Sequence, residues 1–121
     1  MTAMRIARFM GAATACYGLA VAVRPALLLR PCGWSDDDPA RRALARTTAF
    51  RDLASGLGMA LAPTPAALRI ATGGRVISDF SDAGVLAVAL RGQPQRARAV
   101  AVAAGWGVLC GAAGLAATRT E

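Results

Sequence analysis

The run AVAVAAGWGVLCGAAGLAAT, residues 99–118, carries no charged side chain along its whole length. A helix rises about 1.5 Å per residue, so this run is long enough to cross the roughly 30 Å hydrocarbon layer of a membrane. The chain around it has 121 residues, of which 55% are hydrophobic, and a mean hydropathy of +0.44. These values are high for one soluble domain, whose surface requires many polar residues. The sequence therefore predicts an integral protein of the cell membrane.

A second apolar run, FMGAATACYGLAVAV, lies near the N-terminus at residues 9–23. It is short for a membrane span, but a helix over 5–29 is long enough if the Arg24 side chain reaches the membrane surface. A cleaved signal peptide is the alternative interpretation of this run.

Prolines divide the rest of the chain. Asp38 and Pro39 are typical of a helix start, and Pro63 with Pro65 forces a turn, which predicts helices over 40–62 and 66–90. With a last helix over 97–118, we predict one all-α domain covering 1–121. Short connections favour an antiparallel four-helix transmembrane bundle, a multi-pass protein.

The basic residues fit this arrangement. All 14 are Arg, and the net charge is +7. Eight of them flank the first and third predicted loops and four flank the opposite ends, so the positive-inside rule places both termini outside. Binding of nucleic acid would need basic residues gathered on a soluble face, with stacking aromatics for single strands. Aromatic residues make up only 5% of the chain, and we predict no nucleic-acid partner.

Metal and cofactor ligands are scarce. The chain has no His, and Cys16, Cys32 and Cys110 are odd in number and widely spaced, which predicts buried thiols and no disulfide framework. The acidic run 36–38 is explained better by helix capping than by a metal site. We therefore predict no metal and no cofactor.

Small residues recur at helix-packing spacing. Gly107 and Gly111 form such a row in the last predicted helix, and Ala7, Gly11 and Ala15 form one in the first. Rows of this kind let two helix backbones approach closely in lipid. Packing within the bundle and a homodimer both suit them, and internal packing is favoured because four short helices must bury an interface.

The stretch GGRVISDFSDAG, residues 73–84, places Arg75, Asp79 and Asp82 inside the third predicted span. Their spacing puts all three on one helix face and lets Arg75 pair with Asp79 on the next turn. The second predicted span adds Arg51 and Asp52. Adjacent residues point about 100° apart, so one of these two is expected to face the centre of the bundle.

Charges in such a place are unfavourable. Each costs roughly 2.5–3.5 kcal/mol at the bilayer centre on insertion scales, so three in one span cost about 8–10 kcal/mol. Pairing across the bundle or a water-filled cavity must offset this cost. Buried ion pairs are often no more stable than apolar packing. A functional site is therefore favoured over a network that only fixes the helix register.

The pattern formed by Arg46, TTAFRDLASGLGMAL at 47–61 and the stretch at 73–84 resembles a family of short four-span bacterial and fungal membrane proteins, domain of unknown function 4267. The resemblance covers about residues 5–118 and implies the same four-helix topology. It singles out Arg51, Arg75, Asp79 and Asp82. It implies no particular reaction, and Asp52 stands where Glu would be equally expected.

Without His, acid–base chemistry near neutral pH depends on carboxyl groups that share a proton in a medium of low dielectric. We predict Asp79, Asp82 and Asp52 as catalytic residues, with Arg51 and Arg75 binding an anionic group of the substrate. This is the chemistry of a membrane isomerase or cyclase acting on a lipophilic small molecule. A proton or solute transport component and a non-catalytic scaffold or subunit remain open alternatives, and membrane lipid is the expected partner in each case.

Overall fold

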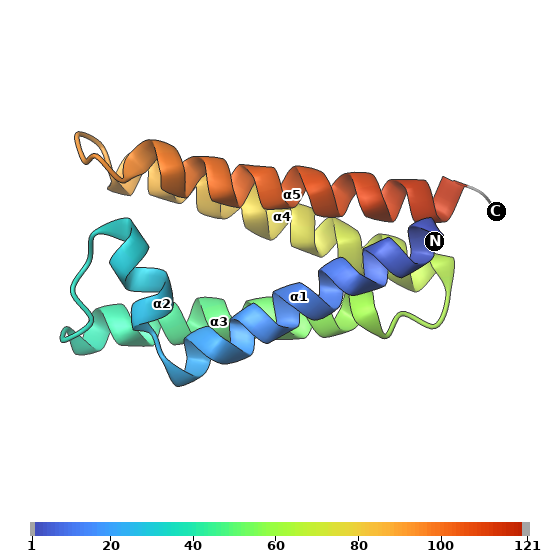
Figure 1. Ribbon diagram of the computed structural model, residues 1–121, viewed down its shortest axis with the longest axis horizontal. Helices are drawn as coiled ribbons and strands as arrows, with labels where there is room; N and C mark the ends of the chain where they lie inside the picture. The colour runs from blue at the N-terminus through green and yellow to red at the C-terminus, as the bar shows by residue number, and fades with distance from the viewer. Residues whose placement is uncertain (1, 120–121) are drawn as a thin grey trace.

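The computed structural model describes residues 2–119, and every regular element in that part of the chain is helical. The four long helices are α1 (Ala3–Val23), α3 (Pro39–Ala60), α4 (Pro65–Ala89) and α5 (Arg96–Arg119). Between α1 and α3 lie a short helix, α2 (Ala26–Leu29), and a 3-10 turn, η1 (Arg30–Cys32). The long helices lie along one common axis (Figure 1). The all-α prediction is confirmed.

Short polar side chains and prolines set the starts of two long helices. The carboxylate of Asp38 accepts a hydrogen bond from the Ala40 N–H at 2.9 Å, and Pro39 follows in the first turn, where an N–H has no helical partner. Thr64 caps α4 in the same way, accepting from the Ala67 N–H at 3.1 Å. Both helices therefore begin within one residue of their predicted starts.

The first helix differs from the prediction of one continuous helix over 5–29. It ends at Val23, and Arg24 leaves the helical region with φ −132° and ψ 87°. Pro25 explains the break, because the residue before a proline avoids the helical conformation. The chain then turns through α2 and η1, which Gly33 ends with a left-handed φ of 78° that favours glycine.

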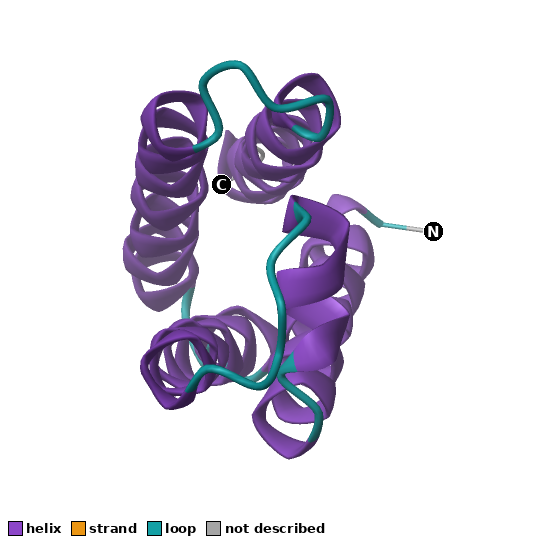
Figure 2. Ribbon diagram, turned by 90° about the vertical axis from the view of Figure 1, so that its left-hand side faces the viewer, coloured by secondary structure: helices purple, strands orange, loops and turns teal. Residues whose placement is uncertain are grey.

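The four long helices form two hairpins. The largest interfaces are those of α1 with α3 and of α4 with α5, whereas α1 with α5 and α3 with α4 share smaller ones. Seen from the end, the long helices stand at the corners of an open quadrilateral (Figure 2). Figure 1 shows α1 and α5 close together near the two termini and diverging toward the end that carries α2.

Glycines permit the close approach of these helices. A Cβ added to Gly56 of α3 would lie 2.5 Å from the Gly11 carbonyl oxygen and 2.5 Å from the Ala15 nitrogen of α1. No real Cβ fits there, so the α1–α3 crossing depends on glycine. Gly107 and Gly111 of α5 likewise face side chains of α4. Both small-residue rows therefore pack within the bundle, and the homodimer stays a prediction.

Two apolar clusters fill the interior. One consists of Ala7, Met59, Ala62, Leu68, Cys110 and Ala117. The other consists of Val21, Leu29, Ala45 and Ala49. Along α3, Asp52 lies between the residues of the first cluster and those of the second. A buried charged residue thus occupies the stretch of interior between the two clusters.

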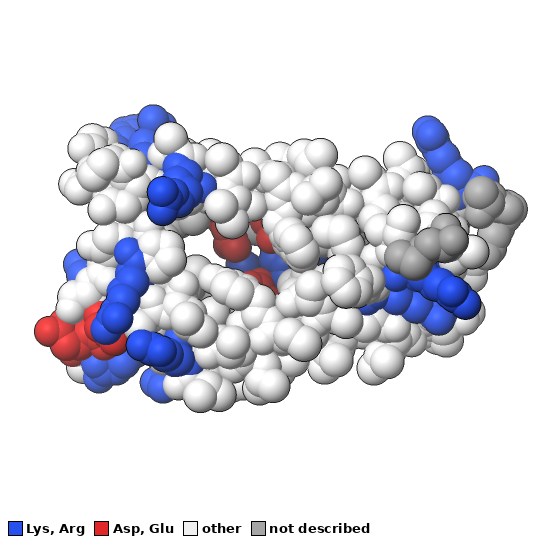
Figure 3. All heavy atoms as spheres, in the orientation of Figure 1, with Lys and Arg blue, Asp and Glu red and all other residues white. Residues whose placement is uncertain are grey.

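Two helices, α1 and α5, are long and apolar enough to cross a membrane. The other two long helices carry more charged residues and do not meet the same criterion of composition. All four nevertheless expose large apolar side chains; examples, one from each, are Phe9, Phe50, Ile77 and Val102. Figure 3 shows basic residues gathered at both ends of one face, and between them a belt whose only charged atoms lie in a central hollow.

Candidate functional site, a buried network of arginine and aspartate

Five charged side chains from α3 and α4 meet inside the molecule. Arg51 and Asp52 come from α3, and Arg75, Asp79 and Asp82 come from α4. These are the five site residues predicted from the sequence. The structure joins all of them in one connected set of ion pairs.

Arg75 lies at the centre of the network. Its guanidinium binds Asp79 through two hydrogen bonds, Nε to Oδ2 at 3.0 Å and Nη2 to Oδ1 at 2.6 Å. This pairing on the next turn of the helix is the one that the spacing predicted. Nη1 extends to α3, where it donates to Asp52 Oδ1 at 2.8 Å and to the Ser55 hydroxyl at 2.7 Å. Every nitrogen of the guanidinium therefore donates to another residue of the protein.

Arg51 forms the second part of the network. Its Nη1 donates to Asp82 Oδ1 at 2.9 Å and its Nη2 donates to Asp82 Oδ2, a two-point contact that bridges α3 and α4. Nη2 also lies 3.3 Å from Asp52 Oδ1. One oxygen of Asp52 is thus shared by both guanidiniums and links the two parts.

The network runs from a closed end to a partly open one. Side-chain exposure is 1% for Arg75, 8% for Asp79 and 11% for Asp52. It rises to 29% for Asp82 and 37% for Arg51. Figure 3 shows acidic and basic atoms at the bottom of the hollow between α1 and α5. The Arg51–Asp82 pair is therefore the part of the network that is most accessible from outside.

The remaining helices enclose the closed end. A Cβ added to Gly107 of α5 would lie 3.0 Å from the Cβ of Asp79, so glycine lets α5 pack directly on the network. The indole Nε1 of Trp106 donates to the Thr14 hydroxyl at 2.8 Å, which ties α5 to α1. The Thr14 hydroxyl in turn donates to the carbonyl of the preceding helical turn.

Ser55 and Gly107 belong to the site, although the sequence did not assign them to it. Ser55 accepts a hydrogen bond from Arg75, and its position four residues after Arg51 on α3 is the signal that could have found it. Gly107 was identified only as a packing residue. No sequence feature connects it with Asp79, because the two lie on different helices.

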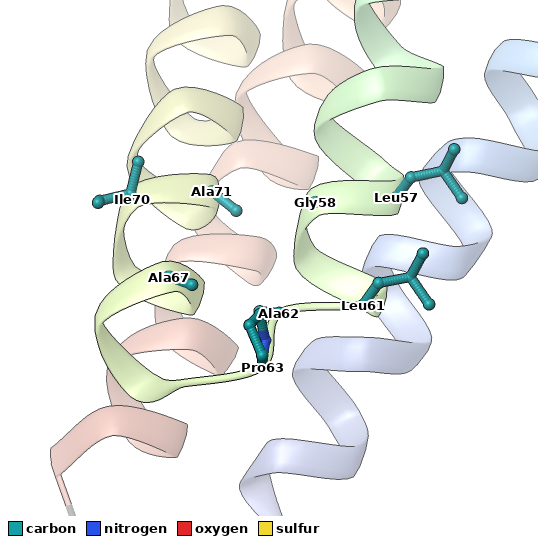
Figure 4. Close-up of a pocket in the computed structure, with 8 residues that line it drawn as sticks. All are labelled: Leu57, Gly58, Leu61, Ala62, Pro63, Ala67, Ile70 and Ala71. Carbon is teal, nitrogen blue, oxygen red and sulfur yellow. The ribbon is translucent and has the colours of Figure 1, made fainter.

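Two cavities lie away from these charges. One, of about 540 Å³, lies where α3 and α4 approach their connecting loop, and only apolar residues line it (Figure 4). Another, of about 430 Å³, lies between α4 and α5 and has Arg69 at its edge. None of the five network residues lines either cavity.

Within residues 2–119 no cluster of three or more acidic or cysteine side chains is placed to bind a metal ion. Cys32 and Cys110 are buried free thiols, as predicted, whereas Cys16 is a free thiol on the exposed side of α1.

The fold and the site define an all-helical protein with two candidate membrane-spanning helices and an interior Arg/Asp network. Comparisons with protein-family models, with curated proteins and with solved structures found no match to this chain.

Proposed function

We propose that the chain is a four-span integral protein of the cell membrane. In the middle of α3 and α4, Asp52, Arg75 and Asp79 are buried and point inward, whereas Arg41, Arg46 and Arg69 are exposed nearer the helix starts. The outer faces of the same helices carry exposed Phe50 and Ile77. A helix whose charged side chains face the interior of a bundle presents apolar side chains to lipid. A criterion that only counts charged residues along the helix does not detect this arrangement.

The same proposal includes the orientation and the family. Arginines are more numerous around the first and third interhelical connections than at the opposite end, so the positive-inside rule places those connections in the cytoplasm and both termini outside. The resemblance to domain of unknown function 4267 supports the same topology, and membership of that family is part of the proposal.

Within this frame, the network is a binding site for the polar group of a lipophilic small molecule. The observation that carries this is the exposure of the Arg51–Asp82 pair, 37% and 29% of the side chains, beside partners that are almost fully buried. A molecule that reaches the network from outside would meet this pair first, because it is the most exposed part. Arg51 would hold an anionic or carbonyl oxygen, because a guanidinium offers several donors in a fixed plane.

The excess of carboxylates over guanidiniums in the network favours proton-transfer chemistry. Three carboxylates against two guanidiniums leave the fully ionised network with one uncompensated negative charge. Such a charge is unfavourable away from water, so the network favours holding one proton. A proton held by the network can pass to the bound molecule, and a carboxylate of the network can later accept one from another of its atoms. The net result is an isomerisation or cyclisation, in which no proton is gained or lost.

The geometry divides the roles of the five residues. Asp82 and Arg51 are the contact residues. Asp79 and Asp52 are the other two carboxylates of the network, and Arg75 holds both of them in place. Although Arg75 was predicted to bind substrate, the geometry favours a positioning role, because it is buried and all its nitrogens are engaged.

A second candidate is a purely structural function, a tie between the two hairpins of a membrane scaffold or subunit. The observation that favours it is that each of the three carboxylates is already bonded to a guanidinium. Neither of the two cavities touches the network. A network of this kind fixes helix register whether or not a ligand binds.

Native mass spectrometry of protein purified from membranes in a mild detergent distinguishes the two candidates. Wild type would be measured beside Arg51→Gln and Asp82→Asn, with Asp37→Asn as a control at an exposed position in the loop before α3. Binding predicts a small molecule retained by wild type and by the control, and lost from both network variants while their helical content persists. Wild type without any retained molecule, beside network variants that unfold or fail to insert, would instead support the structural tie.

A further inference from the structure

The groove between α4 and α5 has no part in the network. It has a volume of about 430 Å³. Gly73, Val76 and Gly111 form part of its wall, with exposed Ile77 and Leu115 at its edges. A Cβ added to Gly73 would meet no atom within 4 Å, so part of the groove is open space that no side chain fills.

Its polar groups lie at one end. Arg69 is exposed, and its Nη2 donates to the Thr118 carbonyl at 2.8 Å. A guanidinium has five N–H donors, so this contact leaves others free for a ligand. One turn deeper lies Thr72, which is 7% exposed and whose hydroxyl has no hydrogen-bond partner among the described residues. The Thr72 side chain packs against Gly114 of α5, so the exposed guanidinium of Arg69 is the polar group that a ligand in the groove can reach.

This polar end lies at a defined level of the bundle. Arg69 is in the second turn of α4, and Thr118 is in the last turn of α5. Both therefore lie at the end that holds the two chain termini (Figure 1). In the proposed topology this end lies at the membrane–water interface. The groove extends from Arg69 to Ile77, about 12 Å along α4 at 1.5 Å per residue, into the apolar middle of the bundle.

We propose that this groove binds one anionic glycerophospholipid. The phosphate lies on Arg69, and an acyl chain follows the small and apolar residues beyond. Guanidinium–phosphate contacts are charge-assisted and strong, and a basic side chain at the interface favours an anionic head group. The inference rests on the membrane part of the proposed function and is independent of the chemistry of the network.

Matched variants test each part of the groove. Arg69→Gln removes the charge. Its control is Arg8→Gln, because Arg8 lies near the same end and donates to a backbone carbonyl outside the groove, that of Ala62 in the loop between α3 and α4. Gly73→Leu fills the open space. Its control is Gly74→Leu, since a Cβ at either glycine meets no atom within 4 Å and Gly74 does not line the groove.

Each protein would be reconstituted in vesicles of phosphatidylglycerol and phosphatidylcholine, extracted in mild detergent, and measured by native mass spectrometry. We expect wild type and both controls to retain one phosphatidylglycerol per chain. Retention should fall about fivefold in Arg69→Gln, the effect of one interfacial basic residue, and should be lost in Gly73→Leu. Inorganic phosphate added without lipid should not bind.

Three results would overturn the inference. They are equal retention of phosphatidylglycerol by all variants, equal retention of phosphatidylcholine and phosphatidylglycerol, and dimers of the chain in place of a lipid adduct. Flotation of the vesicles after an alkaline wash distinguishes these three results from a failure of the proposed membrane topology. A protein that floats but retains no specific lipid contradicts only the groove, whereas one that does not float contradicts the four-span topology.

Discussion

Arg75 and Asp52 meet across the interface between α3 and α4, with Nη1 of the guanidinium 2.8 Å from Oδ1 of the carboxylate. This contact joins the Arg75–Asp79 pair, which lies wholly on α4, to the Arg51–Asp82 pair, which bridges the two helices. The interface between α3 and α4 is one of the smaller ones in the bundle. Two ion pairs, Arg75–Asp52 and Arg51–Asp82, therefore cross this interface and join the two hairpins.

Removing Asp79 should destabilise the protein strongly. In Asp79→Ala the buried guanidinium of Arg75 loses its two-point partner, and breaking a buried pair in this way costs about 3–5 kcal/mol. Asp82→Ala should cost less, because Arg51 is partly exposed and can turn toward water. The free energies of unfolding would be measured by titration with denaturing detergent, followed by circular dichroism. Equal losses in the free energy of unfolding of Asp79→Ala and Asp82→Ala would contradict the conclusion that only one end of the network is closed.

A double variant separates the cost of an unpaired charge from the value of the pair. Arg75→Met combined with Asp79→Leu removes both charges and fills much of their space with apolar atoms. We expect it to be more stable than Asp79→Ala alone, because no unpaired charge remains at Arg75 and Asp52 keeps Arg51 as a partner. The same unfolding titration provides the comparison. If the double variant were less stable than the single one, the Arg75–Asp79 pair itself would be strongly stabilising.

Much of the fold could be predicted from local signals. Asp38 with Pro39, and Pro65 after Thr64, set two helix starts through the backbone chemistry of caps and prolines. The break at Arg24 was missed, because a long apolar run outweighed the effect that Pro25 has on the residue before it. Apolar length shows that a segment can span a membrane, but it does not show that the helix is continuous.

The site could be predicted only in part. The spacing on α4 gave the Arg75–Asp79 pair, since contacts within one helix follow from its period. The pairing of Arg51 with Asp82 depends on how two helices face each other, and one sequence contains no information on that register. The hydrogen bond from Trp106 to Thr14 could not be predicted for the same reason, because it joins residues of two helices far apart in the chain.

Two glycine substitutions should have opposite effects. In Gly56→Ala the new Cβ would lie 2.5 Å from backbone atoms of α1, which cannot move without separating the helices. Overpacking of this kind costs about 1–3 kcal/mol. In Gly105→Ala the new Cβ would meet nothing within 4 Å, and alanine favours a helix over glycine by about 0.8–1.0 kcal/mol. Thermal unfolding should place the first variant below wild type and the second above it.

Trp106 and Thr14 should show energetic coupling. Trp106→Phe keeps the aromatic ring but removes the N–H that donates to the Thr14 hydroxyl, and such a bond contributes about 0.5–1.5 kcal/mol. Thr14→Val removes the acceptor. If the bond links α5 to α1, the two losses in the free energy of unfolding should not add in the double variant. Strict additivity would show that the two side chains act independently.

The thiol of Cys32 should react slowly and in a pH-dependent way. Cys32 lies in η1, outside the long helices, and burial raises the pKa of its thiol. The thiolate is the nucleophile, so a raised pKa leaves less of the reactive form near neutral pH. In a chain carrying Cys16→Ser and Cys110→Ser, labelling by a water-soluble maleimide should be slower than that of a free thiol and should increase as the pH rises. Denaturing detergent should abolish this protection, because it exposes the buried Cys32 side chain. Fast labelling of the folded protein at neutral pH would mean that η1 and α2 open away from the bundle.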